Sequence, residues 1–254
     1  MNRFTDKVVI VTGAGSGMGA ATVKRFAREG ARVVLVGRSA DKLEAVAAGL
    51  QPGQKLVYPA DVSDWEQVQA LIAKTVEYFG QLDVLVNNAG IAPSGKVTEA
   101  SIDDWHKVFA IDVDGVFYGC RAAMPHLIKS RGCIVNVSSV SGLGGDWNMS
   151  FYNAAKGAIS NFTRALALDH GADGVRVNAV NPSLTRSELT DDMFGDEKLM
   201  AKFAERIPLG RAAEPEEVAD VIAFLASHDA RFITGVNLPV DGGLSASNGQ
   251  PPLN

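Results

Sequence analysis

The chain is poor in the residues on which several common classes of protein depend. Only two cysteines, Cys120 and Cys133, occur among its 254 residues, and both lie in apolar stretches. This favours buried free thiols in a reducing compartment over a disulfide framework. The four histidines are scattered without the spacing of metal ligands, so no metal site is predicted.

The chain also lacks long apolar runs and an excess of positive charge. No stretch approaches the roughly 18 apolar residues that a membrane span needs, and no signal peptide precedes Val8. The formal net charge is −5, which argues against a nucleic-acid-binding surface. These absences predict a cytoplasmic protein that binds neither membranes nor nucleic acid.

What the chain does contain is a regular alternation of short β-prone runs with helical patterns. Seven strands separated by helices of crossover length, without a linker-like break, predict one α/β domain over residues 1–254. Its expected fold is a doubly wound parallel sheet of about seven strands with helices on both faces. The predicted strands are Lys7–Thr12, Ala31–Val36, Lys55–Tyr58, Leu82–Val86, Cys133–Val137, Val175–Val180 and Asn237–Val240.

Local signals predict several helix ends. The run Ser63–Glu66 has the pattern of a capping box, which would open a helix that ends at Phe79 before Gly80. Ser101 is expected to cap a long helical stretch that continues to Leu127.

The first predicted strand leads directly into a glycine-rich turn, Gly13-Ala14-Gly15-Ser16-Gly17-Met18-Gly19, and then into a helical pattern. Glycines let the backbone approach phosphate groups, and the N-terminus of a helix offers free N–H groups. The turn is therefore predicted to bind a pyrophosphate. A tight turn without a ligand is the alternative.

The residues after the second strand, Gly37 and Arg38, bear on the choice of cofactor. An acid at this point holds the ribose hydroxyls of NAD, whereas an arginine accepts the 2′-phosphate of NADP. Since Gly37 is not an acid and Arg38 follows it, the sequence favours NADP(H), with NAD(H) as the alternative. Arg38 could also be a solvated surface residue.

A tyrosine and a lysine four residues apart open the helical pattern after the fifth strand. Tyr152 and Lys156 lie on one helix face, where the ammonium favours the phenolate form that a general acid/base needs. Ser138 and Ser139 lie at the end of the preceding strand and could hold a substrate oxygen. Alternatively, the pair is an ordinary surface pair and the serines belong to a turn.

Four motifs at consistent spacing make the chain resemble the short-chain dehydrogenase/reductase family. They are Thr12-Gly13-x-x-x-Gly17-x-Gly19, Asn87-Asn88-Ala89-Gly90, Ser139 thirteen residues before Tyr152, and Tyr152-x-x-x-Lys156. The likeness covers the chain from Lys7 to Gly243. It implies a single Rossmann-type domain, a nicotinamide cofactor and interconversion of carbonyl and alcohol groups on a small molecule.

The resemblance also implies roles for individual residues. Tyr152 would be the general acid/base, Lys156 would assist it and bind the nicotinamide ribose, and Ser139 would orient the substrate oxygen. Further cofactor contacts are implied for Gly13, Ser16, Gly17, Met18, Gly19, Asp61, Val62, Asn88, Ala89, Gly90, Pro182, Leu184 and Thr185.

Two positions depart from the family pattern. Asp112 stands where the family usually has an asparagine that relays protons through a water and the lysine. An ionised Asp112 accepts hydrogen bonds but donates none, and its charge opposes the effect of Lys156 on Tyr152. We expect Asp112→Asn to retain or increase turnover. Ser183 replaces the usual glycine after Pro182, with little expected consequence.

Two segments are expected to cover the substrate: a lid over about residues 186–207 and the loop from Leu143 to Met149. Their apolar side chains favour a hydrophobic ketone or secondary alcohol, unless they pack the lid on its own core or on a neighbouring subunit. The predicted substrate contacts are Ser141, Leu143, Trp147, Met149, Leu189 and Met193.

The sequence thus predicts an NADPH-dependent reductase of a hydrophobic carbonyl compound. An NAD-dependent alcohol, diol or sugar dehydrogenase is the main alternative, with Arg38 stacked on adenine. A catalytically silent nucleotide-binding protein would not need Ser139, Tyr152 and Lys156 together, and the chain is short for a nucleotide-sugar epimerase or dehydratase.

The resemblance further implies a homo-oligomer, a tetramer or dimer, assembled through the long helices of residues 101–127 and 152–171 and through the Pro215 helix.

Overall fold

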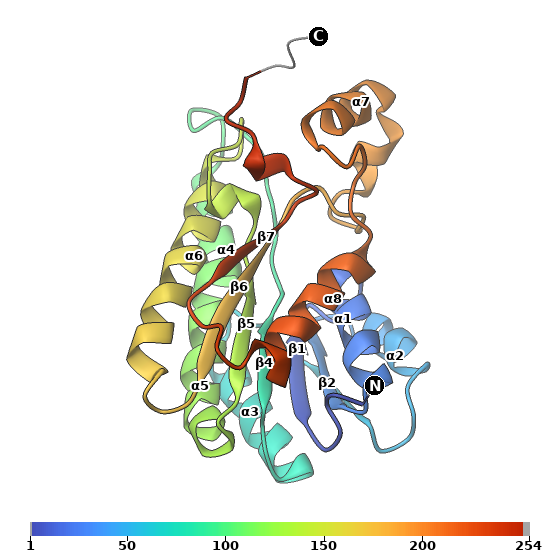
Figure 1. The fold of residues 1–254 in the computed structure, drawn as a ribbon, viewed down its shortest axis with the longest axis vertical. Helices are drawn as coiled ribbons and strands as arrows, with labels where there is room; N and C mark the ends of the chain where they lie inside the picture. Colours follow the sequence, from blue (N-terminus) through green and yellow to red (C-terminus); the bar gives the residue numbers. More distant parts are fainter. Residues whose placement is uncertain (1, 251–254) are drawn as a thin grey trace.

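A computed structural model describes residues 2–250 and contains one seven-stranded parallel sheet (Figure 1). The strands lie in the order β3-β2-β1-β4-β5-β6-β7, so the direction of winding reverses between β1 and β4. This confirms the predicted doubly wound α/β fold. The strands are β1 (Val8–Thr12), β2 (Arg32–Gly37), β3 (Lys55–Pro59), β4 (Val84–Asn87), β5 (Cys133–Val137), β6 (Arg176–Pro182) and β7 (Asn237–Val240).

Helices cover both faces of the sheet, and short helical turns occupy some of the loops. The α-helices are α1 (Gly17–Arg28), α2 (Ala40–Ala47), α3 (Trp65–Phe79), α4 (Ile102–Val108), α5 (Gly115–Ser130), α6 (Ser150–His170), α7 (Glu197–Arg206) and α8 (Pro215–Ala226). In Figure 1, α7 stands apart from the two helical layers, beyond the carboxyl ends of the strands.

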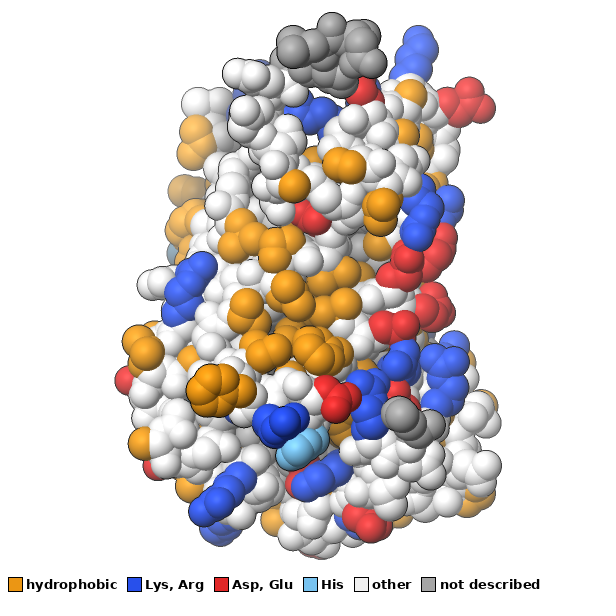
Figure 2. Space-filling model, viewed as in Figure 1, with side chains coloured by type: hydrophobic (Ala, Val, Ile, Leu, Met, Phe, Trp, Pro, Cys, Tyr) orange, Lys and Arg blue, Asp and Glu red, His pale blue; other side chains and the backbone are white. Residues whose placement is uncertain are grey.

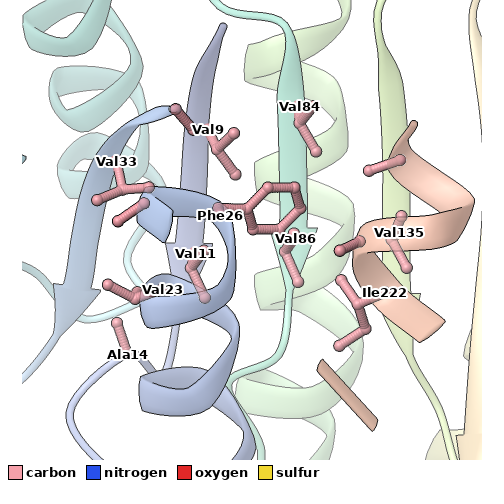
Figure 3. Packing of buried hydrophobic residues seen from close by; sticks show 14 of the residues in the cluster. Val9, Val11, Ala14, Val23, Phe26, Val33, Val84, Val86, Val135 and Ile222 are labelled. Atoms are coloured by element: carbon pink, nitrogen blue, oxygen red, sulfur yellow. The ribbon is translucent and has the colours of Figure 1, made fainter. Parts of the chain in front are cut away.

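Alternate residues of each strand pack into two separate cores, as the period of two along a strand requires. Val9 and Val11 of β1 pack with Phe26 of α1 and Ile222 of α8 on one face (Figure 3). Ile10, between them, packs on the other face with residues of α3, α5 and α6. All five residues of β1 are buried, which explains why its sequence is continuously apolar rather than alternating.

The start of α3 differs from the sequence-based expectation. Its N-cap is Asp64, whose carboxylate accepts a hydrogen bond from the Gln67 amide at 3.1 Å. Ser63 does not cap the helix because its hydroxyl donates to Asp61 Oδ1 at 2.6 Å. The predicted Ser63–Glu66 capping box is therefore wrong by one residue, while Gly80 ends the helix in the left-handed region as expected.

The stretch that follows Ser101 is helical but not a single α-helix. Ser101 caps α4 as predicted, accepting from the Asp104 amide at 2.9 Å. A π-helical segment, Phe109–Asp114, then separates α4 from α5. Such a segment carries an extra residue in its turn and is frequent at functional sites; here it contains the fully buried Asp112.

The two cysteines are buried and free, as the sequence predicts. Burial raises the pKa of Cys120 to about 12 and that of Cys133 to about 11, so both stay as thiols. Among residues 2–250, no helix is long and apolar enough to cross a membrane. The same residues contain no cluster of three or more side chains suited to a metal ion.

Candidate active site

The glycine turn lies at the carboxyl end of β1, where the winding of the sheet reverses, which is where open parallel sheets bind ligands. Gly13 and Gly17 both have positive φ, +64° and +49°, a conformation that favours glycine. A Cβ on Gly19 would overlap the carbonyl oxygen of Gly13. The compact turn therefore needs glycine at these positions.

The N-terminus of α1 is left free for an anion. Its N-cap, Ser16, makes no side-chain capping bond, and no acidic residue occupies its first turn. The first turns of α3, α4, α7 and α8 all contain an acid. Free N–H groups and an uncompensated positive dipole end suit a pyrophosphate, so this end of α1 fits the phosphate groups of a dinucleotide.

A hydrogen-bonded cluster fastens the end of β4 to the end of β1. The Thr12 hydroxyl accepts from the amides of Asn88 and Ala89 at 2.9 and 3.0 Å. The Asn88 side chain donates to the carbonyls of Thr12 and Gly13 at 2.9 and 3.2 Å. The predicted Asn88–Gly90 segment thus lies against the glycine turn.

The two serines after β5 have different partners. Ser138 Oγ donates to the carbonyl of Lys156 at 3.0 Å and lies 2.9 Å from Ser160 Oγ, so it packs against α6. Ser139 Oγ donates to Ser141 Oγ at 3.1 Å. Ser141 in turn hydrogen-bonds Asp146. Ser139 therefore begins a chain of polar groups that ends at an exposed carboxylate.

Tyr152 and Lys156 lie on the first turns of α6, and the ammonium is 5.5 Å from the centre of the phenol ring. The lysine is buried, donates to the Val137 carbonyl at 3.1 Å, and lies 3.1 Å from Asp112 Oδ2. Burial is the largest single effect and disfavours the charged lysine, but Asp112 and Tyr152 together outweigh it, so the pKa of Lys156 is raised above its usual value.

The residues predicted near the adenosine and nicotinamide are also at the carboxyl edge. Arg38 is exposed at the end of β2, and no hydrogen bond or ion pair ties its side chain to the residues 2–250 described. Asp61 binds the backbone and hydroxyl of Ser63 at 2.9 and 2.6 Å, and Val62 is buried. Leu184 and Thr185 are buried just beyond β6, with Pro182 as its last residue.

The predicted substrate residues divide into two groups. Ser141 is buried beside Ser139, and Met149 pairs with Gly95 in an isolated β-bridge. Leu143 and Trp147 point to solvent, with exposed fractions of 41% and 84%. On the lid, Leu189 is exposed and Met193 half-buried. The turn Asp191–Gly195 and α7 contain no fully buried residue, but Met193 and Phe203 are half-buried and Ile207, at the end of the lid, is buried.

Sequence reasoning missed the buried amides that hold these side chains in place. Asn87 donates to Asn136 Oδ1 on the neighbouring strand at 2.9 Å, and Asn136 donates to Thr163 of α6 at 2.9 Å. Asn181 donates to the carbonyl of Ser139 at 2.8 Å. An asparagine within an apolar strand was the available signal, since a buried amide must be hydrogen-bonded.

The chain is similar to a known protein family and to several known proteins. A family model described as enoyl-(acyl carrier protein) reductase matches residues 13–245. The chain is 53% identical over 251 residues to meso-2,3-butanediol dehydrogenase of Serratia marcescens, covering 99% of each chain. It is 39% identical to trans-4-hydroxycyclohexanecarboxylate dehydrogenase of Sinomonas cyclohexanicum, covering 97% of this chain and 96% of that one.

The crystal structure of levodione reductase superposes with a TM-score of 0.93 at 37% identity, covering 96% of this chain and 100% of that one. The chain therefore belongs to the short-chain dehydrogenase/reductase family, as its motifs predict. It is an oxidoreductase that acts on CH–OH and C=O groups with a nicotinamide cofactor, NAD(H) or NADP(H).

The close packing of the glycine turn generates a prediction for cofactor binding. In Gly19→Ala, the added methyl must displace the Gly13 carbonyl, so NADH and NADPH affinity should fall about tenfold or more, roughly 1.4 kcal/mol. Fluorescence titration with NADH and with NADPH measures the two affinities. Gly49→Ala is the matched control, because its Cβ would meet no atom closer than 3.9 Å. Equal affinities in the two variants would contradict a phosphate-binding role for the turn.

Proposed function

We propose that the protein interconverts a small vicinal diol and the corresponding hydroxy ketone with a nicotinamide cofactor. The observation that carries the proposal is the position of Lys156, which lies 5.5 Å from the centre of the Tyr152 ring and donates to the Val137 carbonyl, two residues before Ser139. Its ammonium would also lie 3.3 Å from a Cβ on Gly90, in the segment that is fastened to the glycine turn. Similarity to meso-2,3-butanediol dehydrogenase over 99% of both chains supports the substrate class. It also supports the diol-dehydrogenase alternative of the sequence analysis more than an NADPH-dependent reductase.

The polarity of the substrate loop supports a hydroxylated substrate. Ser139, Ser141 and Asp146 form a chain of hydrogen-bonding groups. In the proposed site, these groups would satisfy a second hydroxyl of the substrate. Of the apolar lid and loop residues behind the hydrophobic-substrate prediction, Leu143, Trp147 and Leu189 are exposed. A compact polar substrate suits this surface better than a large apolar ketone.

In the proposed reaction, Tyr152 and Ser139 act on the substrate oxygen, and Lys156 acts through Tyr152. During oxidation the Tyr152 phenolate takes the hydroxyl proton, and the Ser139 hydroxyl holds the same oxygen as it becomes a carbonyl. Lys156 stabilises the phenolate by its charge. A nicotinamide held by these strand ends would supply the acceptor for the hydride that leaves the carbinol carbon. Reduction runs through the same groups in reverse, with Tyr152 donating its proton.

The cofactor would lie across the carboxyl edge of the sheet, where the direction of winding reverses between β1 and β4. Gly13, Ser16, Gly17, Met18 and Gly19 would hold its pyrophosphate, with Arg38, Asp61 and Val62 at the adenosine end. Asn88, Ala89, Gly90, Pro182, Leu184 and Thr185 would line the remainder. We propose one dinucleotide-binding and catalytic domain over residues 1–254, of which residues 1 and 251–254 lie outside the structure described, with a lid at about 186–207.

Assembly into a homo-oligomer is part of the proposal. Phe117 of α5 and Leu168 of α6 are exposed large apolar residues, and a hollow of about 920 Å³ lies beside α5 and α6. A second surface is the sheet edge at β7. Figure 2 shows hydrophobic side chains gathered over β7 and α8. Val236, just before β7, and Leu238, within it, are half-buried. Both surfaces suit a second copy of the chain.

The assembly can be measured by light scattering. The wild-type mass should be two or four times 26.8 kDa. Leu168→Glu, which places a charge on a side chain that is 85% exposed in the single chain, should lower the mass. Lys74→Glu on α3 is a surface control that should leave it unchanged. A monomeric wild type would contradict the proposed assembly.

Cofactor preference separates the two leading functions. If Arg38 anchors a 2′-phosphate, NADPH should bind more tightly than NADH, and Arg38→Ala should remove that preference while NADH affinity is retained. Fluorescence titration of both nucleotides into both proteins makes the comparison. Tighter binding of NADH by the wild type would rule out the anchor and leave the NAD-dependent diol dehydrogenase.

Catalysis can be tested with meso-2,3-butanediol as the probe substrate. Tyr152→Phe removes only the phenolic hydroxyl, so turnover should fall by about 10²–10⁴-fold, the usual contribution of a general acid/base. Nucleotide binding should persist. Tyr78→Phe, on the exposed side of α3, is the matched control. Full activity in Tyr152→Phe would refute the assigned role of this tyrosine.

A further inference from the structure

A buried carboxylate lies directly beside the lysine of the proposed proton-transfer site. Asp112 Oδ2 is 3.1 Å from Lys156 Nζ, and the two side chains are 0% and 6% exposed. Among the described residues, the ion pair with Lys156 is the polar contact that Asp112 Oδ2 makes. Lys156 also donates a hydrogen bond to the Val137 carbonyl.

The backbone around Asp112 holds the carboxylate at this position. The π-helix Phe109–Asp114 carries it, and the amide of Ile91 donates to its other oxygen, Oδ1, at 2.9 Å. Gly90 lies against the ion pair: a Cβ there would be 2.8 Å from Oδ2 and 3.3 Å from Lys156 Nζ. The side chain is therefore packed and oriented from two segments and has little freedom to turn away from the lysine.

Few other charges lie around Tyr152. Lys156 is on its own helix, Asp112 is on the π-helix, and Asp146 in the preceding loop is engaged with Ser141. Helix α4, which packs on α6, carries only charges that are exposed: Asp103, Asp104, His106 and Lys107. The strand β5 and the turn Val140–Gly142 carry none. Strand β6, which also packs on α6, carries Arg176, whose guanidinium donates to the carbonyls of Leu225 and Ala226, and Asp114 of the π-helix is exposed. Of these charged side chains, only Lys156 and Asp112 are buried.

We propose that Asp112 is a positioning residue that neutralises part of the charge of Lys156 and so opposes the assistance that Lys156 gives to Tyr152 in alcohol oxidation. The inference rests on the proposed function. The ammonium favours the phenolate that takes the alcohol proton, and a carboxylate 3.1 Å from that ammonium cancels much of its field. The same carboxylate keeps the buried lysine protonated.

The decisive comparison is between Asp112→Asn and Asp114→Asn. Both remove one negative charge from the same π-helix, but Asp114 is exposed and Asp112 is fully buried. The pH profile of meso-2,3-butanediol oxidation should move to lower pH in Asp112→Asn, by about one unit or more for loss of a close charge. Asp114→Asn should keep the wild-type profile. Turnover near neutral pH should be retained or increased in Asp112→Asn.

A second readout needs neither substrate nor turnover. The near-ultraviolet absorbance of tyrosinate reports ionisation of Tyr152 as the difference between each protein and its Tyr152→Phe counterpart. This difference should appear at lower pH in Asp112→Asn than in wild type. Asp112→Ser, which also lacks the charge, should shift in the same direction and serves if the asparagine variant does not fold.

An unchanged Tyr152 absorbance titration in folded Asp112→Asn would overturn the inference, because the charge would then not be felt at the phenol. Loss of activity at every pH, with nucleotide binding intact, would also overturn it and would indicate that the carboxylate is required as an acceptor. Failure of the proposed function has a different signature. The wild type would then not oxidise the diol. The absorbance comparison would still show whether the charge of Asp112 affects ionisation of Tyr152.

Discussion

Parallel pairing of β1, β4, β5 and β6 is the constraint on which the site depends. Because these strands run in one direction, their carboxyl ends meet at one edge of the sheet, and the residues that follow them become neighbours. The glycine turn, Asn88–Gly90, Ser139 and Thr185 come from four different strands. Hydrophobic packing on both faces fixes the register of those strands and therefore the positions of the groups at their ends.

Polar contacts inside the apolar framework then set the finer geometry. Hydrogen bonds connect adjacent strands near their carboxyl ends, and they are made by Thr12, Asn136 and Asn181. Each such bond contributes only about 0.5–1.5 kcal/mol net, but leaving one partner unsatisfied costs about 1–3 kcal/mol. Alternative arrangements of the strand ends are therefore disfavoured more strongly than the native one is stabilised, which suits a site that needs fixed distances.

The positive charge of Lys156 at the proposed site is balanced by the negative charge of Asp112. A buried lysine alone would be costly to keep protonated, and a buried aspartate alone would be costly to keep ionised. Placed 3.1 Å apart, each reduces the cost of the other. The consequence for chemistry is that the cation beneath Tyr152 acts with only part of its charge. The family's usual asparagine would leave that charge undiminished.

The sequence alone determined the class of fold, the family and the residues of the proposed active site. These features are local patterns: apolar strands, a glycine turn and the Tyr152–Lys156 spacing. Each can be interpreted without knowing which distant residues it will contact. Local signals failed where neighbours compete: Asp61 engages Ser63, so Asp64 caps α3. Only the tertiary structure decided which serine packs against α6, which apolar residues of the substrate loop face solvent, and that Asp112 touches Lys156. Those outcomes depend on contacts between segments far apart in the chain, such as the contact of Asp112 with Lys156, 44 positions later. No periodicity within a segment encodes such contacts.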